Sequence, residues 1–317
     1  MRYDGHDPAL DRGRQYARPR HDTWRCQISV QIITDSACDL PLALAEERGI
    51  CVMPMPFTFK GEDRIDDLGK SMDFDEFYTA MRAGEQATTS QVPLGTSYEA
   101  IGRAHAAGYE ALVVTLSSEL SGTYAAACLA RDQFMKEHPD AAVRVVDSRC
   151  ASTGEGLLVL AAAERAAAGT PVAELAEWVE ANRLRVNHLF TIDSFDHLVR
   201  GGRVSSAVGA VGTVLNIKPV MRVDGFGRLV PLMKPRGRHK ALEAIVDMTA
   251  ERIEDAASQT IVVAHGQWPE YAEELKRMLL ERITPAGVID ARVGCIIGAH
   301  TGPGVLAVYF WGQEREP

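Results

Sequence analysis

The chain has 317 residues, of which 46% are hydrophobic and 24% are charged, a composition typical of a soluble globular protein. This length exceeds the size at which one hydrophobic core usually stops growing, so we expect two domains or one large α/β domain. The formal net charge of -9 argues against a nucleic-acid partner, because phosphate binding needs lysine and arginine gathered on one face.

The first 26 residues are rich in arginine and contain no apolar core of a signal peptide, so we predict a disordered extension over residues 1–26. No stretch approaches the roughly 18 consecutive apolar residues that a membrane span requires, which predicts a protein without stable membrane insertion. The cysteines are scattered without CxxC spacing, which predicts reduced thiols, a cytoplasmic location and no structural metal. They are Cys26, Cys38, Cys51, Cys128, Cys150 and Cys295.

From Gln27 onward, short runs rich in β-branched residues alternate with helical stretches, the pattern of a parallel α/β fold. The Ala-rich stretch 153–168 predicts the last helix of a first domain over residues 27–169, with the boundary near Gly169 and Thr170. The strands predicted in this half, each followed by a helix, are 28–34, 50–55, 111–116 and 143–147.

The second half, residues 170–317, has a different pattern. The segment Asp224-Gly225-Phe226-Gly227 joins two predicted strands through a tight turn, and such a hairpin implies antiparallel pairing within the sheet. We therefore expect a mixed sheet covered by helices. Its predicted strands are 188–192, 219–223, 228–231, 260–264, 293–297 and 305–310.

Two polar segments in the first half are candidate ligand contacts. Thr34, Asp35 and Ser36 lie at the carboxyl end of the first strand, where ligands of α/β sheets collect. Thr89 and Ser90 belong to a polar loop predicted between two helices, whose hydroxyls suit a hydrogen-bonding cup. Both segments also fit simple helix capping, which taken alone is the favoured interpretation for the polar loop.

The segment 117–124 is the most informative local motif, because it follows a predicted strand and opens the next helix. Amide groups at a helix start, together with the hydroxyls of Ser121 and Thr123, favour an anion such as a carboxylate or phosphate. Gly122 allows the backbone to approach such a ligand closely. The motif therefore predicts an anion site.

Arginines and one histidine in the second half are further candidates. The segment Arg200-Gly201-Gly202-Arg203 predicts a helix end with Gly201 as its cap, and its arginines suit either an acidic ligand or plain helix electrostatics. The basic segment 234–238 has the same two readings. His300 is predicted on a loop between two strands, where small neighbours would let a ligand reach its imidazole.

In this order, the motifs of the chain resemble the DegV family over roughly residues 28–312. The matching motifs are Thr-Asp-Ser (34–36), Thr-Ser-Gln-x-Pro (89–93), Ser-Ser-x-Leu-Ser-Gly-Thr-Tyr (117–124), Arg-Gly-Gly-Arg (200–203), Lys-Pro-x-Met and Lys-Pro-Arg (218–236), and Gly-x-His-x-Gly-Pro-Gly (298–304).

The resemblance implies a three-layer α/β/α domain, a mixed-sheet α/β domain and a long-chain fatty acid held between them. It implies no cofactor and no catalysis by the chain itself, and a fatty acid kinase subunit as the partner that phosphorylates the bound carboxylate. The carboxylate would contact Thr89, Ser121, His300 and an arginine. Arg236 is favoured for that arginine and Arg238 is kept open, because the residues beside them depart from the family pattern.

Two other functions are compatible with the same residues. An acyl hydrolase would use Ser121 as nucleophile, His300 as base and Asp35 to orient the base, although Ser121 lacks the Gly-x-Ser-x-Gly elbow. The resemblance also extends to the substrate domain of dihydroxyacetone kinases, in which a histidine holds the ketone. The chain contains no nucleotide-binding loop of the GxxxxGK[ST] type, which favours a carrier.

Overall fold

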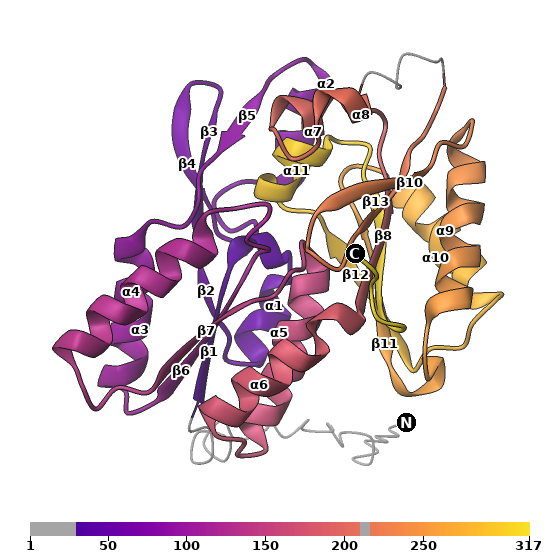
Figure 1. Cartoon of the computed structure of the whole chain (residues 1–317). Coiled ribbons are helices and arrows are strands. Elements are labelled where there is room, and N and C mark those ends of the chain that lie inside the picture. The colour runs from indigo at the N-terminus through magenta and orange to yellow at the C-terminus, as the bar shows by residue number, and fades with distance from the viewer. Residues whose placement is uncertain (1–29, 210–215) are drawn as a thin grey trace, which may run out of the picture.

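The computed structural model of the chain describes residues 30–209 and 216–317 (Figure 1). The extension predicted for residues 1–26 lies outside this range. Two sheets of different construction stand side by side, and a small third sheet lies above the first in the view of Figure 1.

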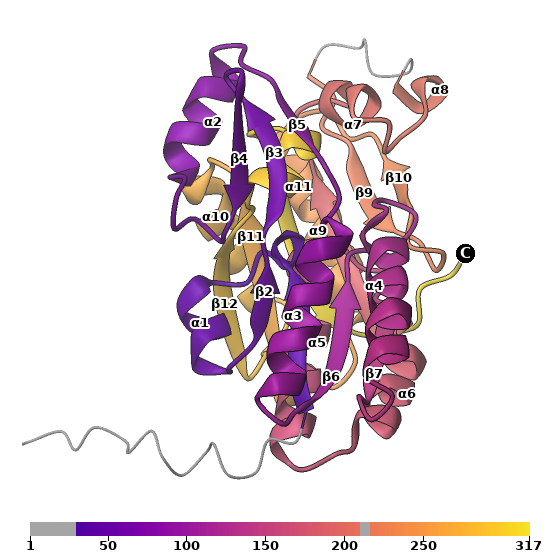
Figure 2. The ribbon, with the colours of Figure 1, turned by 90° about the vertical axis from the view of Figure 1, so that its left-hand side faces the viewer.

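The first sheet is parallel and carries helices on both faces. Ile33 and Val113 pack in one hydrophobic cluster with helices α3 (Leu94–Ala106) and α4 (Thr123–Glu137). Ile32 and Leu112, which point to the opposite face, pack with α1 (Leu42–Glu47), α5 (Thr153–Ala167) and α6 (Val172–Asn182). Figure 2 shows α3 and α4 in front of the strands. The strands are β1 (Val30–Asp35), β2 (Cys51–Met53), β6 (Glu110–Thr115) and β7 (Val143–Asp147), in the order β2-β1-β6-β7.

A small antiparallel sheet interrupts this alternation and was not predicted from the sequence. The expected strand 50–55 divides at Pro54 into β2 and β3 (Met55–Phe59), and β3 continues into a hairpin with β4 (Glu62–Asp66) before α2 (Phe74–Arg82). The expectation that a helix follows each strand is therefore wrong here. Apolar residues continue on both sides of Pro54, so the sequence pattern did not separate the two strands. The third strand is β5 (Ala87–Thr89), which pairs with β3.

The second sheet is mixed, as predicted, and has the order β10-β9-β8-β13-β11-β12. Only β11 and β12 pair in parallel among its neighbouring strands in the described residues. Helices α9 (Arg238–Arg252) and α10 (Pro269–Leu280) cover one face, and the other face is turned toward the first sheet (Figure 1). The strands are β8 (Val186–Thr191), β9 (Val220–Val223), β10 (Leu229–Met233), β11 (Thr260–His265), β12 (Gly287–Arg292) and β13 (Leu306–Trp311).

One predicted strand of this half is wrong. Residues 293–297 begin the short helix α11 (Cys295–Thr301), whereas the strand beside β11 is the unpredicted β12. A short apolar run does not distinguish a buried strand from a buried helix. Two carboxylates of the first half favour the helix here, because they accept hydrogen bonds from amides at its start. Asp39 accepts from the Gly294 amide at 2.9 Å, and Asp66 accepts from the Ile296 amide at 3.2 Å.

The remaining elements are short and lie between the strands and longer helices; of these, only the turn Arg183–Arg185 links the first half to the second. They are the short helices α7 (Asp196–Arg200) and α8 (Ser206–Gly209) and the 3-10 turns Ser36–Cys38, Arg183–Arg185 and Ala256–Ser258. The three-layer α/β/α half and the mixed-sheet half are thus both confirmed. Helix α6 follows the expected boundary at Gly169 and Thr170 but packs on β6 and β7, so we propose that the first domain extends through α6.

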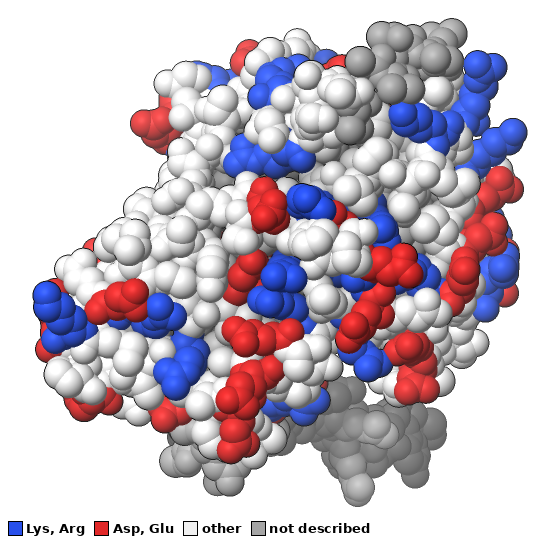
Figure 3. Space-filling model, in the orientation of Figure 1, with Lys and Arg blue, Asp and Glu red and all other residues white. Residues whose placement is uncertain are grey.

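The surface of the face in Figure 3 carries acidic and basic side chains interspersed over most of its area. Within the described residues, no helix combines the length and the apolar composition needed to cross a bilayer.

Candidate functional site

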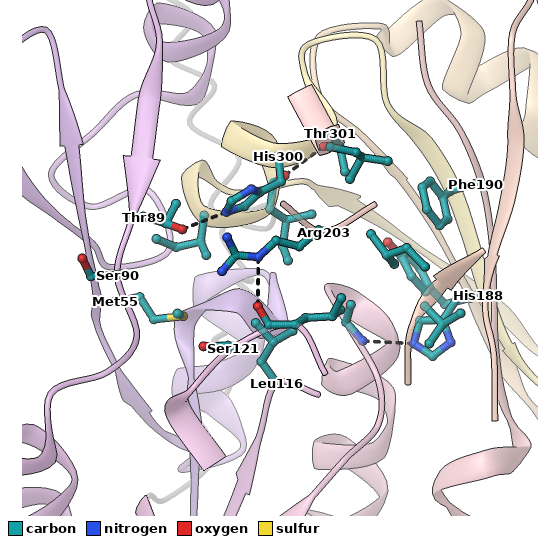
Figure 4. A pocket seen from close by; sticks show the side chains of 18 residues that line it. Met55, Thr89, Ser90, Leu116, Ser121, His188, Phe190, Arg203, His300 and Thr301 are labelled. Atoms are coloured by element: carbon teal, nitrogen blue, oxygen red, sulfur yellow. Dashed lines mark hydrogen bonds between the residues drawn. The ribbon is translucent and has the colours of Figure 1, made fainter. Parts of the chain in front are cut away.

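A cavity lies between the two halves of the molecule and draws its walls from both. It encloses about 680 Å³ of space not filled by atoms, counting the solvent at its mouth. The lining is mostly apolar; Thr89, Ser121, Arg203 and His300 lie on one side of it, and His188 lies on the other (Figure 4). From the first half the walls include Met55, Thr89, Ser90, Leu116, Leu120, Ser121 and Ala151; from the second half they include His188, Phe190, Leu198, Arg203, Val223, Leu229, Ile296, Ile297, His300, Thr301 and Tyr309.

Thr89 and His300 meet across the two halves. The Thr89 hydroxyl lies 2.8 Å from Nε2 of His300, as Figure 4 shows. Thr89 is the last residue of β5, where it pairs with Phe57 of β3, so the small sheet fixes its position and it is not part of a loop between helices as predicted. His300 is on helix α11 and not on the predicted loop between strands. Both residues nevertheless line the cavity.

Burial keeps the imidazole of His300 neutral. Desolvation, followed by the nearby charges of Arg203 and His197, lowers the pKa of His300 to about 4. Its Nδ1 atom is buried and has no hydrogen-bond partner in the described part of the chain. A Cβ atom on Gly201 would lie 2.1 Å from this Nδ1, so glycine is needed there for the imidazole to fit.

Ser121 lies on the cavity wall just before helix α4. Its hydroxyl oxygen accepts a hydrogen bond from the Thr123 amide at 3.2 Å and lies 2.9 Å from the Thr123 hydroxyl. Ser121 therefore holds the amide of the first residue of α4 and still lies on the cavity wall. Gly122 is not a lining residue, because a Cβ there would lie 1.9 Å from Oε1 of Gln91, which packs against it. Ser90 lines the edge of the cavity.

Arg203 is the arginine that lines the cavity. It donates to the backbone oxygens of Leu120 at 3.0 Å and Gly201 at 2.6 Å, and burial lowers its pKa. Among the described residues, no carboxylate oxygen lies within 4.0 Å of a guanidinium nitrogen of Arg203. Its charge is therefore not neutralised by an ion pair. It therefore gives the polar side of the cavity a positive charge.

The arginine assignment made from the sequence requires correction. Arg236 is exposed and does not line the cavity. Arg238 donates to Asp193 and to the Gly304 carbonyl oxygen, and so is already paired. The sequence pattern marked Arg203 only as a residue near a helix end. The turn at Gly202, with φ of +72°, directs the chain after α7 so that Arg203 reaches the cavity.

Thr34, Asp35 and Ser36 lie outside the cavity lining, and all three are fully buried. Thr34 donates to Glu155 at 2.8 Å, and Ser36 accepts from the Met55 amide at 3.1 Å. Asp35 accepts from the amides of Ala37 and Leu116. These polar groups are occupied by internal hydrogen bonds, so they support the fold behind the cavity.

The apolar side of the cavity could not be read from the sequence. Its wall combines residues from strands of the second sheet with α7, α11 and the loop after β6, and no single segment contributes more than a few of them. Only their shared burial in the folded molecule brings them together.

The arrangement does not assemble the serine hydrolase considered as an alternative. Nε2 of His300 faces Thr89, and the Asp35 carboxylate is directed to the Leu116 and Ala37 amides. Ser121 interacts with Thr123. A nucleophile, base and orienting carboxylate in one hydrogen-bonded chain are required for that chemistry.

Comparison with known proteins assigns the chain to a family. The family model described as "Uncharacterised protein, DegV family" matches residues 29–312. A DegV domain-containing protein of Clostridium perfringens is 37% identical over 286 residues, which cover 90% of this chain and 98% of that protein.

Two solved structures share the fold over nearly their whole length. A DegV family protein of Thermus thermophilus, described as fatty-acid binding, is 28% identical with a TM-score of 0.81, covering 90% of this chain and 100% of the other. A DegV family protein of Ruminococcus gnavus, described with vaccenic acid, is 27% identical with a TM-score of 0.81, covering 89% and 99%.

Proposed function

This chain belongs to the DegV family, and we propose that it binds one long-chain fatty acid in the cavity between its two halves. The observation that carries the proposal is a largely apolar cavity with Thr89, Ser121, Arg203 and His300 on one side. A fatty acid has the same division into an apolar chain and an anionic end. The fatty acids described for the related structures support the same ligand class.

The acyl chain would supply the driving force for binding. Burial of about 14 methylenes at roughly 0.8 kcal/mol each contributes on the order of 11 kcal/mol before the entropy of association is subtracted. The apolar walls formed by residues such as Phe190, Leu198 and Ile297 would surround this part of the ligand.

The polar side would fix the orientation of the acid. A buried carboxylate costs several kcal/mol unless it is paired or hydrogen-bonded. The guanidinium of Arg203 has no carboxylate partner in the described chain, and the hydroxyls of Thr89 and Ser121 are available at the cavity wall. We propose that these groups hold the carboxylate together with the neutral imidazole of His300.

We further propose that the chain performs no chemistry itself and presents the bound acid, in the cytoplasm, to a fatty acid kinase subunit. This part rests on the DegV motifs and on the scattered cysteines of the sequence. The test is conversion of the bound acid to an acyl phosphate, trapped with hydroxylamine, when a fatty acid kinase subunit and ATP are added. Absence of the hydroxamate with a kinase that accepts other DegV carriers would contradict this role.

Native mass spectrometry of the purified protein tests the ligand directly. We expect a co-purified acid of about 14 to 18 carbons, whose burial accounts for its retention. Delipidated protein should regain thermal stability with palmitate or oleate. A protein that is purified empty and is not stabilised by either acid would overturn the proposal.

A matched pair of arginine variants tests the orientation. Arg203→Gln should weaken palmitate binding by about 1.5 to 3 kcal/mol, because a hydrogen bond to a charged group is lost. Arg236→Gln carries the same charge change on an exposed residue and should bind as the wild type does. Fluorescence titration of delipidated proteins measures both. The reverse ranking would show that the carboxylate lies elsewhere.

A further inference from the structure

A second, smaller cavity lies on the opposite face of the second sheet, beneath helix α9. It encloses about 290 Å³ of space not filled by atoms, counting solvent at its mouth. Its walls are Asn187, His188, Leu189, Arg222, Val223, Leu232, Met248, Arg252 and Arg315. We propose that this cavity binds an oxyanion of about the size of phosphate, through its three arginines.

Arg315 is the central observation. The residue is 3% exposed, and its guanidinium donates to the backbone oxygens of Asp224 at 2.8 Å and Arg183 at 3.0 Å and to the Cys150 sulfur at 3.6 Å. Its Nε atom is buried without a hydrogen-bond partner in the described residues. The direct partners of Arg315 are thus neutral groups, and Asp224 acts on its charge without forming an ion pair. A buried charge that lacks a paired counter-ion is costly.

Arg222 adds a second donor of the same kind. It lies opposite Leu189 in the pairing of β9 with β8, and its Nε atom is also buried without a partner among residues 30–209 and 216–317. Buried nitrogen donors are nearly always satisfied in folded proteins, so two such donors at one cavity require an explanation. A bound oxyanion would accept from both.

Arg252 completes the set from the end of helix α9. It donates to the Asn187 side-chain oxygen at 2.9 Å and to the backbone oxygen of Glu314 at 3.0 Å. No ion pair of Arg222, Arg252 or Arg315 is found in the described part of the chain, although nearby Arg185 pairs with Glu254. Three arginines without a direct ion pair around one small cavity favour an anion over water, and guanidinium groups bind phosphate and carboxylate oxygens through paired hydrogen bonds.

The site is separate from the cavity between the two halves. Successive side chains of a strand point to opposite faces, so His188 and Phe190 of β8 face the first half whereas Asn187 and Leu189 face α9. His188 and Val223 contribute to the walls of both cavities, which therefore stand back to back. The proposal does not require that the protein bind a fatty acid.

Calorimetric titration of the delipidated protein with inorganic phosphate tests the site, with ionic strength held constant by sodium chloride. The wild type should bind one phosphate per chain, and Arg222→Gln combined with Arg252→Gln should weaken binding at least tenfold. Arg282→Gln, an exposed arginine that pairs with Asp247 on α9, is the matched control and should bind normally. Each variant is checked for folding by circular dichroism. Arg315→Gln is less suitable, because it also removes donors to two backbone oxygens.

Two results would overturn the proposal: no saturable phosphate binding by the wild type, or equal binding by the double variant. A parallel titration with glycerol 3-phosphate distinguishes the sources of the oxyanion. Tighter binding than that of inorganic phosphate, lost in the same double variant, would assign an organic phosphate monoester. Equal or weaker binding would assign the free ion.

Discussion

Segments 34–36 and 117–123 lie at the carboxyl ends of the adjacent strands β1 and β6, at the same edge of the parallel sheet. Both combine hydroxyls with a helix start, and both are candidate ligand contacts in the sequence. In the first segment Asp35 is fully buried and accepts from two backbone amides. In the second, Ser121 lines the cavity and has one neighbouring residue, Thr123, as its partner.

The difference shows that the position of a polar residue at the sheet edge does not by itself make it a ligand contact. Asp35 differs from Ser121 in the number of backbone amides nearby that need a hydrogen-bond acceptor: Asp35 serves two and Ser121 serves one. The segment after β1 is covered by α5 and by the small sheet, whose groups use its polar atoms: Thr34 bonds Glu155 and Ser36 bonds Met55. The segment after β6 faces the gap between the two halves.

Replacement of Asp35 should have the largest effect, and it should act on stability. Asp35→Ala leaves the Ala37 and Leu116 amides without acceptors, at about 1 to 3 kcal/mol each, so we expect the free energy of unfolding to fall by about 2 to 6 kcal/mol. Urea denaturation measures the change. Asp35→Asn keeps one acceptor oxygen and should lose less. An Asp35→Ala protein as stable as the wild type but unable to bind palmitate would reverse the comparison.

Replacement of Ser121 should act mainly on binding. Ser121→Ala should weaken palmitate binding by about 1 to 3 kcal/mol, whereas loss of its bond to the Thr123 amide should cost about 1 kcal/mol of stability. Ser118→Ala is a matched control, because Ser118 bonds to Asp147 and does not line the cavity. If both variants bind equally well, Ser121 does not contact the carboxylate.

Much of the fold could be predicted because it depends on local patterns. Buried β-branched runs identified β1, β6, β7, β8 and β13 within one or two residues, and the turn at 224–227 identified the β9–β10 hairpin. Helix α11 could not be identified in this way, since its first amides are held by Asp39 and Asp66, which lie more than 200 residues away in the chain.

The polar side of the cavity was predictable in part for a similar reason. Thr89, Ser121 and His300 belong to compact motifs, and each lines the cavity. The choice between Arg203 and Arg236 depends on the path of the chain after α7, which sequence spacing does not reveal. The apolar walls depend on packing between the two halves and had no local signal.

The pH dependence of stability should distinguish the two segments further. Burial raises the pKa of Asp35 to about 7, against an ordinary value of 3.8, so the folded protein holds this proton where the unfolded chain has lost it. The contribution of Asp35 to the unfolding free energy should therefore fall as pH rises from about 4 to 7, by at most about 1.4 kcal/mol per pH unit. Urea denaturation at pH 5 and pH 7 should show a smaller decrease for Asp35→Asn than for the wild type. Equal decreases would show that Asp35 does not titrate in this range.

We expect the smallest effect from pH on the affinity of the cavity for palmitate. Burial and the charge of Arg203 lower the pKa of His300 to about 4. The imidazole is therefore uncharged at pH 7 and remains so in mildly acidic solution. A bound carboxylate would raise this pKa, and binding that depends on His300 should therefore strengthen only toward acid pH. The ratio of palmitate affinities between wild type and His300→Gln should stay constant from pH 7 to pH 9, a comparison in which the ionisation of the free acid cancels. A ratio that changes across this range would mean that His300 carries charge at neutral pH, and that the cavity, like the segment after β1, responds to protons.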